Sequence, residues 1–204
     1  MSEYGKYIVL EGTEATGKLY QASKLSAFNE KMLGRRSLYL LNDANGAMEP
    51  LQEPGGTKRA NEIRRTLSDA SQPLSPWQHV ELLTEARAAT WNETILPALD
   101  DGIDVITGTN YISTVTRLGE AAGLGQEAIL NYTFEHAGPE YMSPDFIAVL
   151  ALKKERARRG HMSNGYVRYA AQHALPVIDA GDHLTSHKRV FDRILDHTYK
   201  LLTR

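Results

Sequence analysis

Short hydrophobic runs alternate along this chain with longer stretches in which apolar residues recur every three or four positions. The runs are nearly continuous, which is typical of strands that are buried on both faces. They lie at 7–10, 36–41, 103–107, 144–152 and 175–178. The periodic stretches predict helices at 17–33, 58–67, 76–99, 113–122, 125–137, 166–173 and 184–202.

This alternation predicts an α/β fold, in which a parallel sheet carries helices on both faces and the crossovers are right-handed. Ligands of such sheets bind at the carboxyl ends of the strands. The chain has 204 residues and no Pro/Gly/Ser-rich linker divides it. We therefore expect a single domain over 1–204.

Residues 11–18 connect the first strand to the first helix and read EGTEATGK. Gly12 and Gly17 allow the backbone to curl so that its N–H groups point inward, and Lys18 can reach the outer phosphates of a nucleotide. The pattern predicts a P-loop, a P-loop NTPase-type sheet and ATP as ligand, rather than a simple turn. We expect the ATP contacts to come from Gly12, Thr13, Glu14, Ala15, Thr16, Gly17, Lys18 and Leu19.

The position after the P-loop lysine departs from the motif. A Ser or Thr hydroxyl normally binds Mg²⁺ there, but this chain has Leu19 followed by Tyr20. We therefore predict a loop that holds phosphate and lacks its metal-binding hydroxyl, and we assign no residue as a metal ligand.

Composition narrows the possible partners. The formal net charge is −2, from 23 basic and 25 acidic residues, which suggests neither a nucleic-acid partner nor an acidic membrane surface. The chain contains no cysteine, so disulfides and thiolate metal sites are excluded. No apolar run is long enough for a signal peptide or a membrane span. We expect a cytoplasmic protein.

Three local features allow more than one interpretation. The basic segment 153–159 is either a solvated helix face or a source of arginines for ATP. His183 and His187 could share a metal, but a third ligand is not evident. Trp77 and Trp91 belong to the core or to a subunit interface, since the helix at 76–99 has more apolar residues than one core-facing stripe requires. We expect a symmetric homodimer through this helix.

The order and spacing of five segments resemble those of thymidylate kinases along nearly the whole chain. The segments are EGTEATGK, QEPGGT, ELLTEAR, a strand that ends beside a Tyr, and PDFIAVLAL. The resemblance implies the fold of nucleoside monophosphate kinases and transfer of the γ-phosphoryl group of ATP to dTMP, with Mg²⁺.

The resemblance also implies site residues. Lys18, Glu14 and Arg87 match the catalytic positions, and Arg87 matches the arginine that holds the acceptor nucleotide. From the residues alone, Arg87 could instead pair with Glu62 or Glu85. Arg156 could bring a lid arginine to ATP. The remaining acceptor contacts fall on Glu53, Pro54, Gly55, Leu83, Asn110, Tyr111 and Arg117.

Several departures from the family pattern fall on one site. Leu83 stands where an aromatic stacks on thymine, and Gln52 stands where an arginine is expected. Gly108 and Thr109 align with an Asp and an Arg that organise Mg²⁺ and phosphate, while Arg117 and Leu118 replace a Tyr-Gln pair. The segment 160–165 is all that remains for a lid, so the lid is expected to be short.

These observations leave three hypotheses. The first is a thymidylate kinase with substituted contacts and weak activity. The second is a catalytically impaired relative that binds nucleotide phosphates and acts as a regulator or scaffold. The third is a kinase for another nucleoside monophosphate, because the base-reading positions have changed together.

Overall fold

A computed structural model describes residues 4–42, 48–50, 54–71, 73–120, 122–152, 160–181 and 187–203. Its centre is a five-stranded parallel sheet with the strand order β2-β5-β1-β6-β7. The strands are β1 (Tyr7–Gly12), β2 (Ser37–Leu38), β5 (Asp104–Thr107), β6 (Phe146–Ala151) and β7 (Val177–Asp179). The expected parallel α/β sheet is confirmed.

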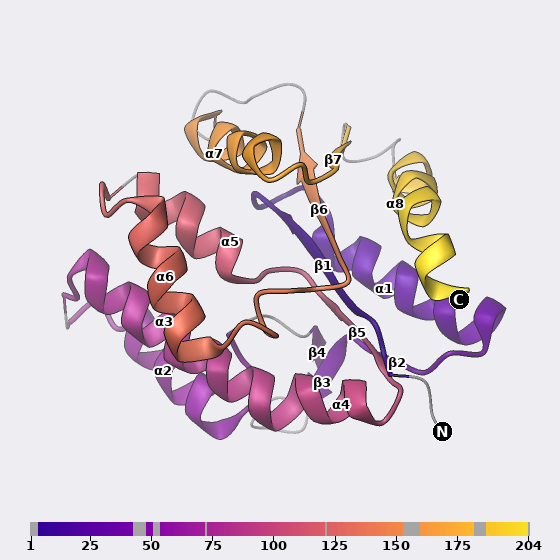
Figure 1. Cartoon of the computed structure of the whole chain (residues 1–204), viewed down its shortest axis with the longest axis horizontal. Coiled ribbons are helices and arrows are strands. Elements are labelled where there is room, and N and C mark those ends of the chain that lie inside the picture. Colours follow the sequence, from indigo (N-terminus) through magenta and orange to yellow (C-terminus); the bar gives the residue numbers. More distant parts are fainter. Residues whose placement is uncertain are drawn as a thin grey trace.

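The two faces of the sheet are covered by different sets of helices (Figure 1). Ile8 and Leu10 of β1 contribute to a buried cluster with α1 (Lys18–Phe28) and α8 (His187–Leu202). Tyr7 and Val9 point to the opposite face and join a second cluster. Helices of that side are α3 (Pro76–Thr90), α4 (Leu96–Asp100), α5 (Tyr111–Thr114), α6 (Gln126–Ala137) and α7 (Gly160–Gln172). The two-residue alternation along β1 therefore places apolar side chains in both layers.

The helix expected at 76–99 begins as the sequence indicates, with Ser75 as N-cap and Pro76 in the first turn. The hydroxyl of Ser75 accepts from Gln78 N–H, and the side chain of Gln78 accepts from Ser75 N–H, which completes a capping box. The winding then changes to a π-helical turn at Trp91–Ile95 before α4. Two further π-helical segments cover Asn29–Leu33 and Val115–Glu120.

The expected second strand at 36–41 is wrong in its extent. Only β2 (Ser37–Leu38) pairs with β5, and the chain then leaves the sheet to form β3 (Leu40–Asn42), which pairs antiparallel with β4 (Met48–Pro50). Strand β2 lies at the edge of the sheet and has β5 as its single neighbour, so the residues after Leu38 are free to leave the sheet. Helix α2 (Lys58–Ser68) follows this hairpin, with Thr57 as N-cap.

The expectation that 160–165 forms a polar interruption is also wrong. Helix α7 begins at Gly160 rather than near 166. The residues expected to form a short lid, 160–165, thus belong to the first turns of α7. The basic segment 153–159 lies outside the described residues. Among the helices described, none is long and apolar enough to cross a membrane.

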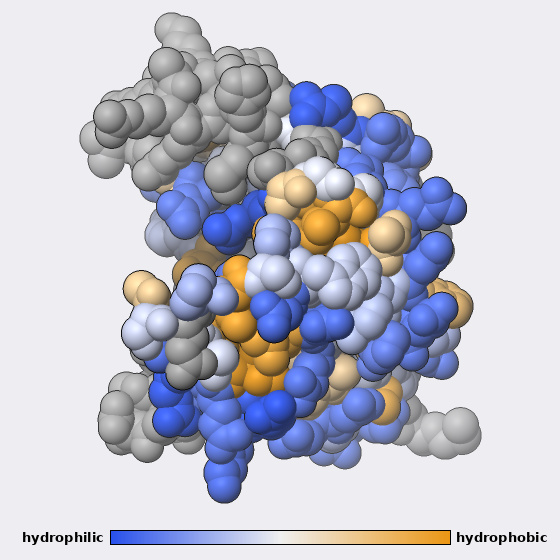
Figure 2. Space-filling view, turned by 90° about the vertical axis from the view of Figure 1, so that its left-hand side faces the viewer, coloured by the Kyte–Doolittle hydropathy of each residue, from blue (hydrophilic) through white to orange (hydrophobic). Residues whose placement is uncertain are grey.

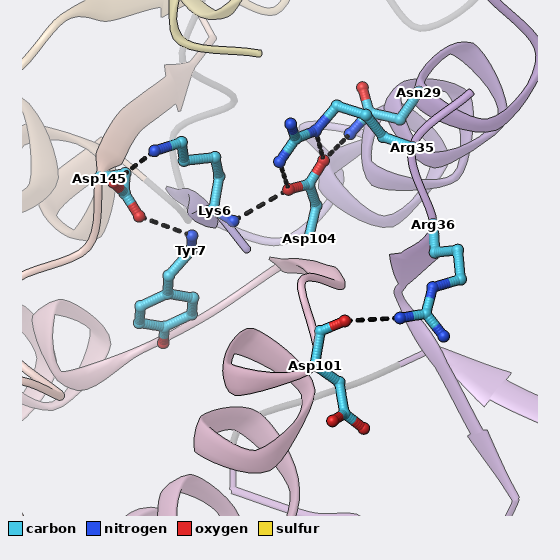
Figure 3. A network of polar contacts seen from close by, with 8 residues as sticks. All are labelled: Lys6, Tyr7, Asn29, Arg35, Arg36, Asp101, Asp104 and Asp145. Atoms are coloured by element: carbon cyan, nitrogen blue, oxygen red, sulfur yellow. Dashed lines mark hydrogen bonds and ion pairs between the residues drawn. The ribbon is translucent and has the colours of Figure 1, made fainter. Parts of the chain in front are cut away.

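A charged network closes the amino end of the sheet (Figure 3). Asp104, at the start of β5, is fully buried. Its carboxylate accepts hydrogen bonds from Arg35 Nε and Nη2 at 2.7 and 2.6 Å, Asn29 Nδ2 at 3.0 Å and Lys6 N at 2.9 Å. Because Asn29 begins the π-helical segment after α1, Arg35 lies in the connection to β2 and Asp104 begins β5, the network joins the end of the first helical segment to β5.

Candidate functional site

The loop between β1 and α1 has the backbone conformation that the glycine pattern predicts. Gly17 has φ 77° and Ala15 has φ 66°, so both lie in the left-handed region, where Ala15 is strained. The Thr16 hydroxyl donates to Thr13 O at 2.8 Å across the turn. Helix α1 begins directly afterwards, at Lys18. The curled loop therefore leads into a helix N-terminus, the arrangement that binds phosphate.

Gly12 is required for a second reason. Its φ is 134°, and a Cβ at this position would lie 2.2 Å from the carbonyl oxygen of Leu150 in β6. Only a residue without a side chain permits β1 and β6 to approach this closely where the loop begins.

A cavity of about 520 Å³ lies over the loop at the carboxyl ends of β1 and β5. Of the eight residues at 12–19 that were predicted to contact ATP, seven line it, and buried Thr16 is the exception. The lining residues are Gly12, Thr13, Glu14, Ala15, Gly17, Lys18, Leu19, Tyr20, Gly108, Thr109, Ser113, Arg117 and Tyr166. Arg117, predicted as an acceptor contact, thus lies on the phosphate side.

Lys18 is folded back onto its own loop. Its Nζ donates to Gly12 O and to Thr13 O, both at 2.7 Å. Burial lowers the pKa of Lys18, the charges of Glu11 and Glu14 raise it, and the positive charge of Arg117 lowers it. The ammonium group of Lys18 is therefore hydrogen-bonded to two loop carbonyls, and a bound phosphate would have to compete with them for it.

Glu11 contacts two residues of the cavity wall, Gly12 and Ser113, and the sequence interpretation gave it no role. It is fully buried at the end of β1, and its carboxylate accepts from Asn110 N at 2.7 Å, Ser113 Oγ at 2.9 Å and Gly12 N at 3.2 Å. Burial raises its pKa, while the hydrogen bonds from Asn110, Ser113 and Gly12 and the charge of Lys18 lower it. Tyr166 OH donates to Ser113 Oγ at 2.9 Å, and burial raises the pKa of Tyr166 to about 12. The network ties β1 to the start of α5 and to α7.

Leu19 and Gly108 meet in the cavity where the motif would supply metal ligands. A Cβ at Gly108 would lie 2.8 Å from Cδ2 of Leu19 and 3.8 Å from Cβ of Lys18. Among the residues described, no group of three His, Cys, Asp or Glu side chains could hold a metal. Mg²⁺ prefers carboxylates, hydroxyls and water, so the side chains at 19 and 108 do not fit this ion.

A second group of predicted residues lies on α3 and around it. Arg87 is 2% exposed, its Nη1 donates to Thr114 Oγ1 at 2.6 Å, and its Nε has no partner among the described residues. The alternative pairing with Glu62 or Glu85 is not observed, because Arg59 contacts Glu85 at 2.6 Å and Glu62 at 3.8 Å. A buried arginine without a carboxylate partner is a candidate anion site.

The Pro54-Gly55 loop lies against the same helix. Thr90 Oγ1 donates to Gly55 O at 2.8 Å and accepts from Gly55 N at 3.3 Å. Leu83, also on α3, is half-buried, as is Pro54. None of these residues lines the cavity over the loop. Glu53 and Arg156 lie outside the described residues.

Asn110 and Tyr111 have structural partners. Asn110 caps α5, with Oδ1 accepting from Ile112 N at 3.0 Å, while its buried Nδ2 has no partner. Tyr111 is buried and its ring lies 6.1 Å from that of Tyr141. The substrate roles of both stay predictions. Helix α5 nevertheless joins the two groups, since Ser113 lines the cavity and Thr114 contacts Arg87.

The relatives found by comparison with known proteins are thymidylate kinases. No protein-family model matches the chain. The thymidylate kinase of Caldicellulosiruptor saccharolyticus is 31% identical over 155 residues, which cover 75% of this chain and 68% of the relative. That of Chlamydia muridarum is 30% identical over 149 residues, covering 73% and 68%. That of Chlamydia trachomatis serovar L2 is 29% identical over 161 residues, covering 76% and 73%.

A solved structure agrees in fold. The crystal structure of thymidylate kinase from Ehrlichia chaffeensis superposes with a TM-score of 0.74 at 19% identity, covering 96% of this chain and 99% of that one. At this identity the likeness shows the fold alone, a P-loop NTPase-like α/β sheet.

Proposed function

We propose, since this chain belongs to the thymidylate kinase family, that it binds ATP over the loop at 12–18 and transfers its γ-phosphoryl group to dTMP. The observation that carries the proposal is the cavity of about 520 Å³, with the curled loop, the start of α1 and Lys18 on one wall. Backbone N–H groups and a helix N-terminus hold phosphate without regard to the base. The proposal includes a cytoplasmic location, where both nucleotides occur.

The acceptor nucleotide is assigned to Arg87. Its guanidinium is buried, keeps an unpaired Nε and sits on α3 next to the Gly55 loop. A phosphate dianion there would receive charge-assisted hydrogen bonds, which are stronger than neutral ones. Leu83, one turn earlier, offers apolar contact to a base without aromatic stacking.

The transfer is proposed to be slow. Phosphoryl transfer is catalysed by positioning and by neutralising charge, and the described cavity supplies two cations for this, Lys18 and Arg117. To act, Lys18 has to exchange its two loop carbonyls for phosphate oxygens. The residues at 19 and 108 do not fit Mg²⁺, so no step is assigned to that ion.

The test is ADP release from ATP with a panel of nucleoside monophosphates, with and without Mg²⁺. We expect turnover below the usual kinase range of about 1–100 s⁻¹, with dTMP preferred. The control is Lys18→Ala, which removes the phosphate-binding ammonium and should abolish release. A different preferred acceptor would favour the third hypothesis. Undiminished activity in Lys18→Ala would contradict the site assignment.

A second candidate function is nucleotide binding without turnover, as in a regulator or scaffold. The contact between Leu19 and Gly108 favours it, since an apolar pair stands where the motif places metal ligands. The two functions separate in one experiment: ADP binding by calorimetry together with no ADP release above the Lys18→Ala background would establish the second.

A homodimer is part of the proposal. The side of the molecule formed by α2, α3 and α6 shows hydrophobic residues gathered within a hydrophilic rim (Figure 2). On α6, Phe134 is 54% exposed, and Trp77 of α3 packs edge-on against Tyr132 of α6 at 5.4 Å. Light scattering at micromolar concentration tests this, and a monomer would contradict it.

A further inference from the structure

The place where a P-loop site holds its cation is defined by two positions. One is the residue after the loop lysine, and the other is the end of the strand beside the loop strand. In this chain these are Leu19 and Gly108. β5 pairs parallel with β1 so that Thr107 is level with Val9, and Gly108 follows directly. Both residues line the cavity.

Leu19 fills the space that a side chain at 108 would occupy. Its Cδ2 lies 2.8 Å from the site of a Cβ on Gly108, closer than real contacts of this kind. The atoms nearest to this point, from Leu19 and from the Cβ of Lys18, are therefore all carbon. A hydrated cation placed there would lose water ligands and gain no oxygen from either residue.

Around this volume the oxygens of Glu11, Ser113 and Thr16 are already engaged in hydrogen bonds, and the other threonine hydroxyls, those of Thr13, Thr107 and Thr109, are neutral. The Glu11 carboxylate accepts from Asn110 N, Gly12 N and Ser113. Ser113 Oγ donates to it and accepts from Tyr166. The Thr16 hydroxyl donates to Thr13 O. Of the lining residues that the structure describes, Glu14 alone is acidic, and it is exposed.

The cavity instead offers cations directly to an anion. Lys18 and Arg117 both line it, and they are close enough for the charge of Arg117 to act on Lys18. A polyphosphate bound in the loop would lie between Lys18 and Arg117, and the two cations would neutralise its negative charge. A cation chelated by the same phosphates would compete for those oxygens and meet Leu19.

We infer that this site binds a nucleoside di- or triphosphate in its metal-free form, with Leu19 and Gly108 in place of a cation-binding pair. The inference rests on the proposed binding of nucleotide in the loop. It predicts that Mg²⁺ does not strengthen binding.

Calorimetry of the full chain with ADP, in EDTA and in excess Mg²⁺, tests the inference. We expect Mg²⁺ to leave the dissociation constant unchanged or to raise it. Binding at least about tenfold tighter with Mg²⁺ would overturn the inference and leave the proposed function standing. Failure to bind in both buffers would overturn the proposed function, and the inference with it.

Two variants identify the residues responsible. Leu19→Ser with Gly108→Asp supplies a hydroxyl and a carboxylate in the emptied volume and should make ADP binding about tenfold tighter with Mg²⁺. Leu19→Ala is the matched control, because it empties the volume without adding oxygen, and its binding should stay independent of Mg²⁺. A response to Mg²⁺ in Leu19→Ala equal to that in the double variant would overturn the assignment to missing oxygen ligands.

Discussion

The arginines at the two ends of the sheet differ in how they are paired. At the amino end, Asp104 receives four hydrogen bonds, two of them from Arg35, and its charge is paired (Figure 3). At the carboxyl end, within the part of the chain that the structure describes, Arg87 has no carboxylate partner and an unpaired Nε, and buried Asn110 Nδ2 and Thr107 Oγ1 have no partners. Neutral buried groups are left unpaired at both ends, among them Asn29 Oδ1 and Ser37 Oγ at the amino end, so the contrast lies in the arginines.

The difference in arginine pairing indicates that one end of the sheet contributes to stability and the other to ligand binding. Removing one partner of a buried ion pair leaves an uncompensated charge and destabilises the fold. A buried cation without a partner already costs free energy in the empty protein, and an anionic ligand would offset that cost. The amino end of this sheet therefore holds the fold together, while the carboxyl end is arranged for a ligand.

The variant Asp104→Asn tests whether the network at the amino end of the sheet stabilises the fold. It removes the charge that Arg35 faces, so we expect the free energy of unfolding to fall by about 3–5 kcal/mol, measured in urea. Asp192→Asn is the control, because the exposed pair with Lys188 is worth about 0.5 kcal/mol or less. Equal losses in both variants would show that the network is not a stabilising centre.

The carboxyl end should respond in activity instead. Leu19→Ser with Gly108→Asp and Thr109→Arg restores a hydroxyl, a carboxylate and a cation together, and we expect kcat with ATP, Mg²⁺ and dTMP to rise about 10²-fold. The three single variants should gain less, because groups that act as a unit are non-additive. A folded triple variant that binds ATP but turns over no faster would indicate that the acceptor side limits the rate.

Arg87→Met sharpens the contrast, since it should affect binding and stability in opposite directions. Loss of charge-assisted hydrogen bonds should weaken dTMP binding about 10- to 100-fold, at about 1.5–3 kcal/mol for such bonds. The free energy of unfolding should stay equal or rise, because an unpaired buried charge is removed. Arg64→Met, on the exposed side of α2, controls for loss of positive charge. A large loss of stability in Arg87→Met would instead indicate a structural arginine.

The smallest effect concerns pH. Burial raises the pKa of Glu11 in the folded chain, so the folded state binds more protons than the unfolded state above about pH 4.5. The free energy of unfolding therefore falls as pH rises through this window. In Glu11→Gln this component is absent, so the stability of the parent relative to the variant should decrease from pH 4 to 8. A difference that grows with pH would mean that the hydrogen bonds to the carboxylate outweigh its burial.

Much of the architecture could be predicted from periodicity. The buried runs and amphipathic stretches predicted where β1, β5, β6, β7 and the main helices lie along the chain. The departure of the chain after Leu38 could not be predicted, because an apolar run does not reveal whether its later residues have a neighbouring strand.

The site was predicted less completely. The loop at 12–18 is a local motif, so its position and its curled backbone could be predicted, while its role in binding ATP stays a prediction. The role of Glu11 depends on partners 99 and 102 positions away, and a single carboxylate at the end of a buried strand gave no indication of them. Leu19 and Gly108 were noticed as separate departures, whereas their contact is a property of the fold.

That contact also constrains how the two positions could have changed over evolutionary time. A carboxylate that arrived first at 108 would have to displace Leu19, whose Cδ2 lies 2.8 Å from its Cβ. A smaller residue arriving first at 19 would meet no such obstacle. Substitutions at the two positions are therefore coupled, since a carboxylate at 108 displaces less once residue 19 is small.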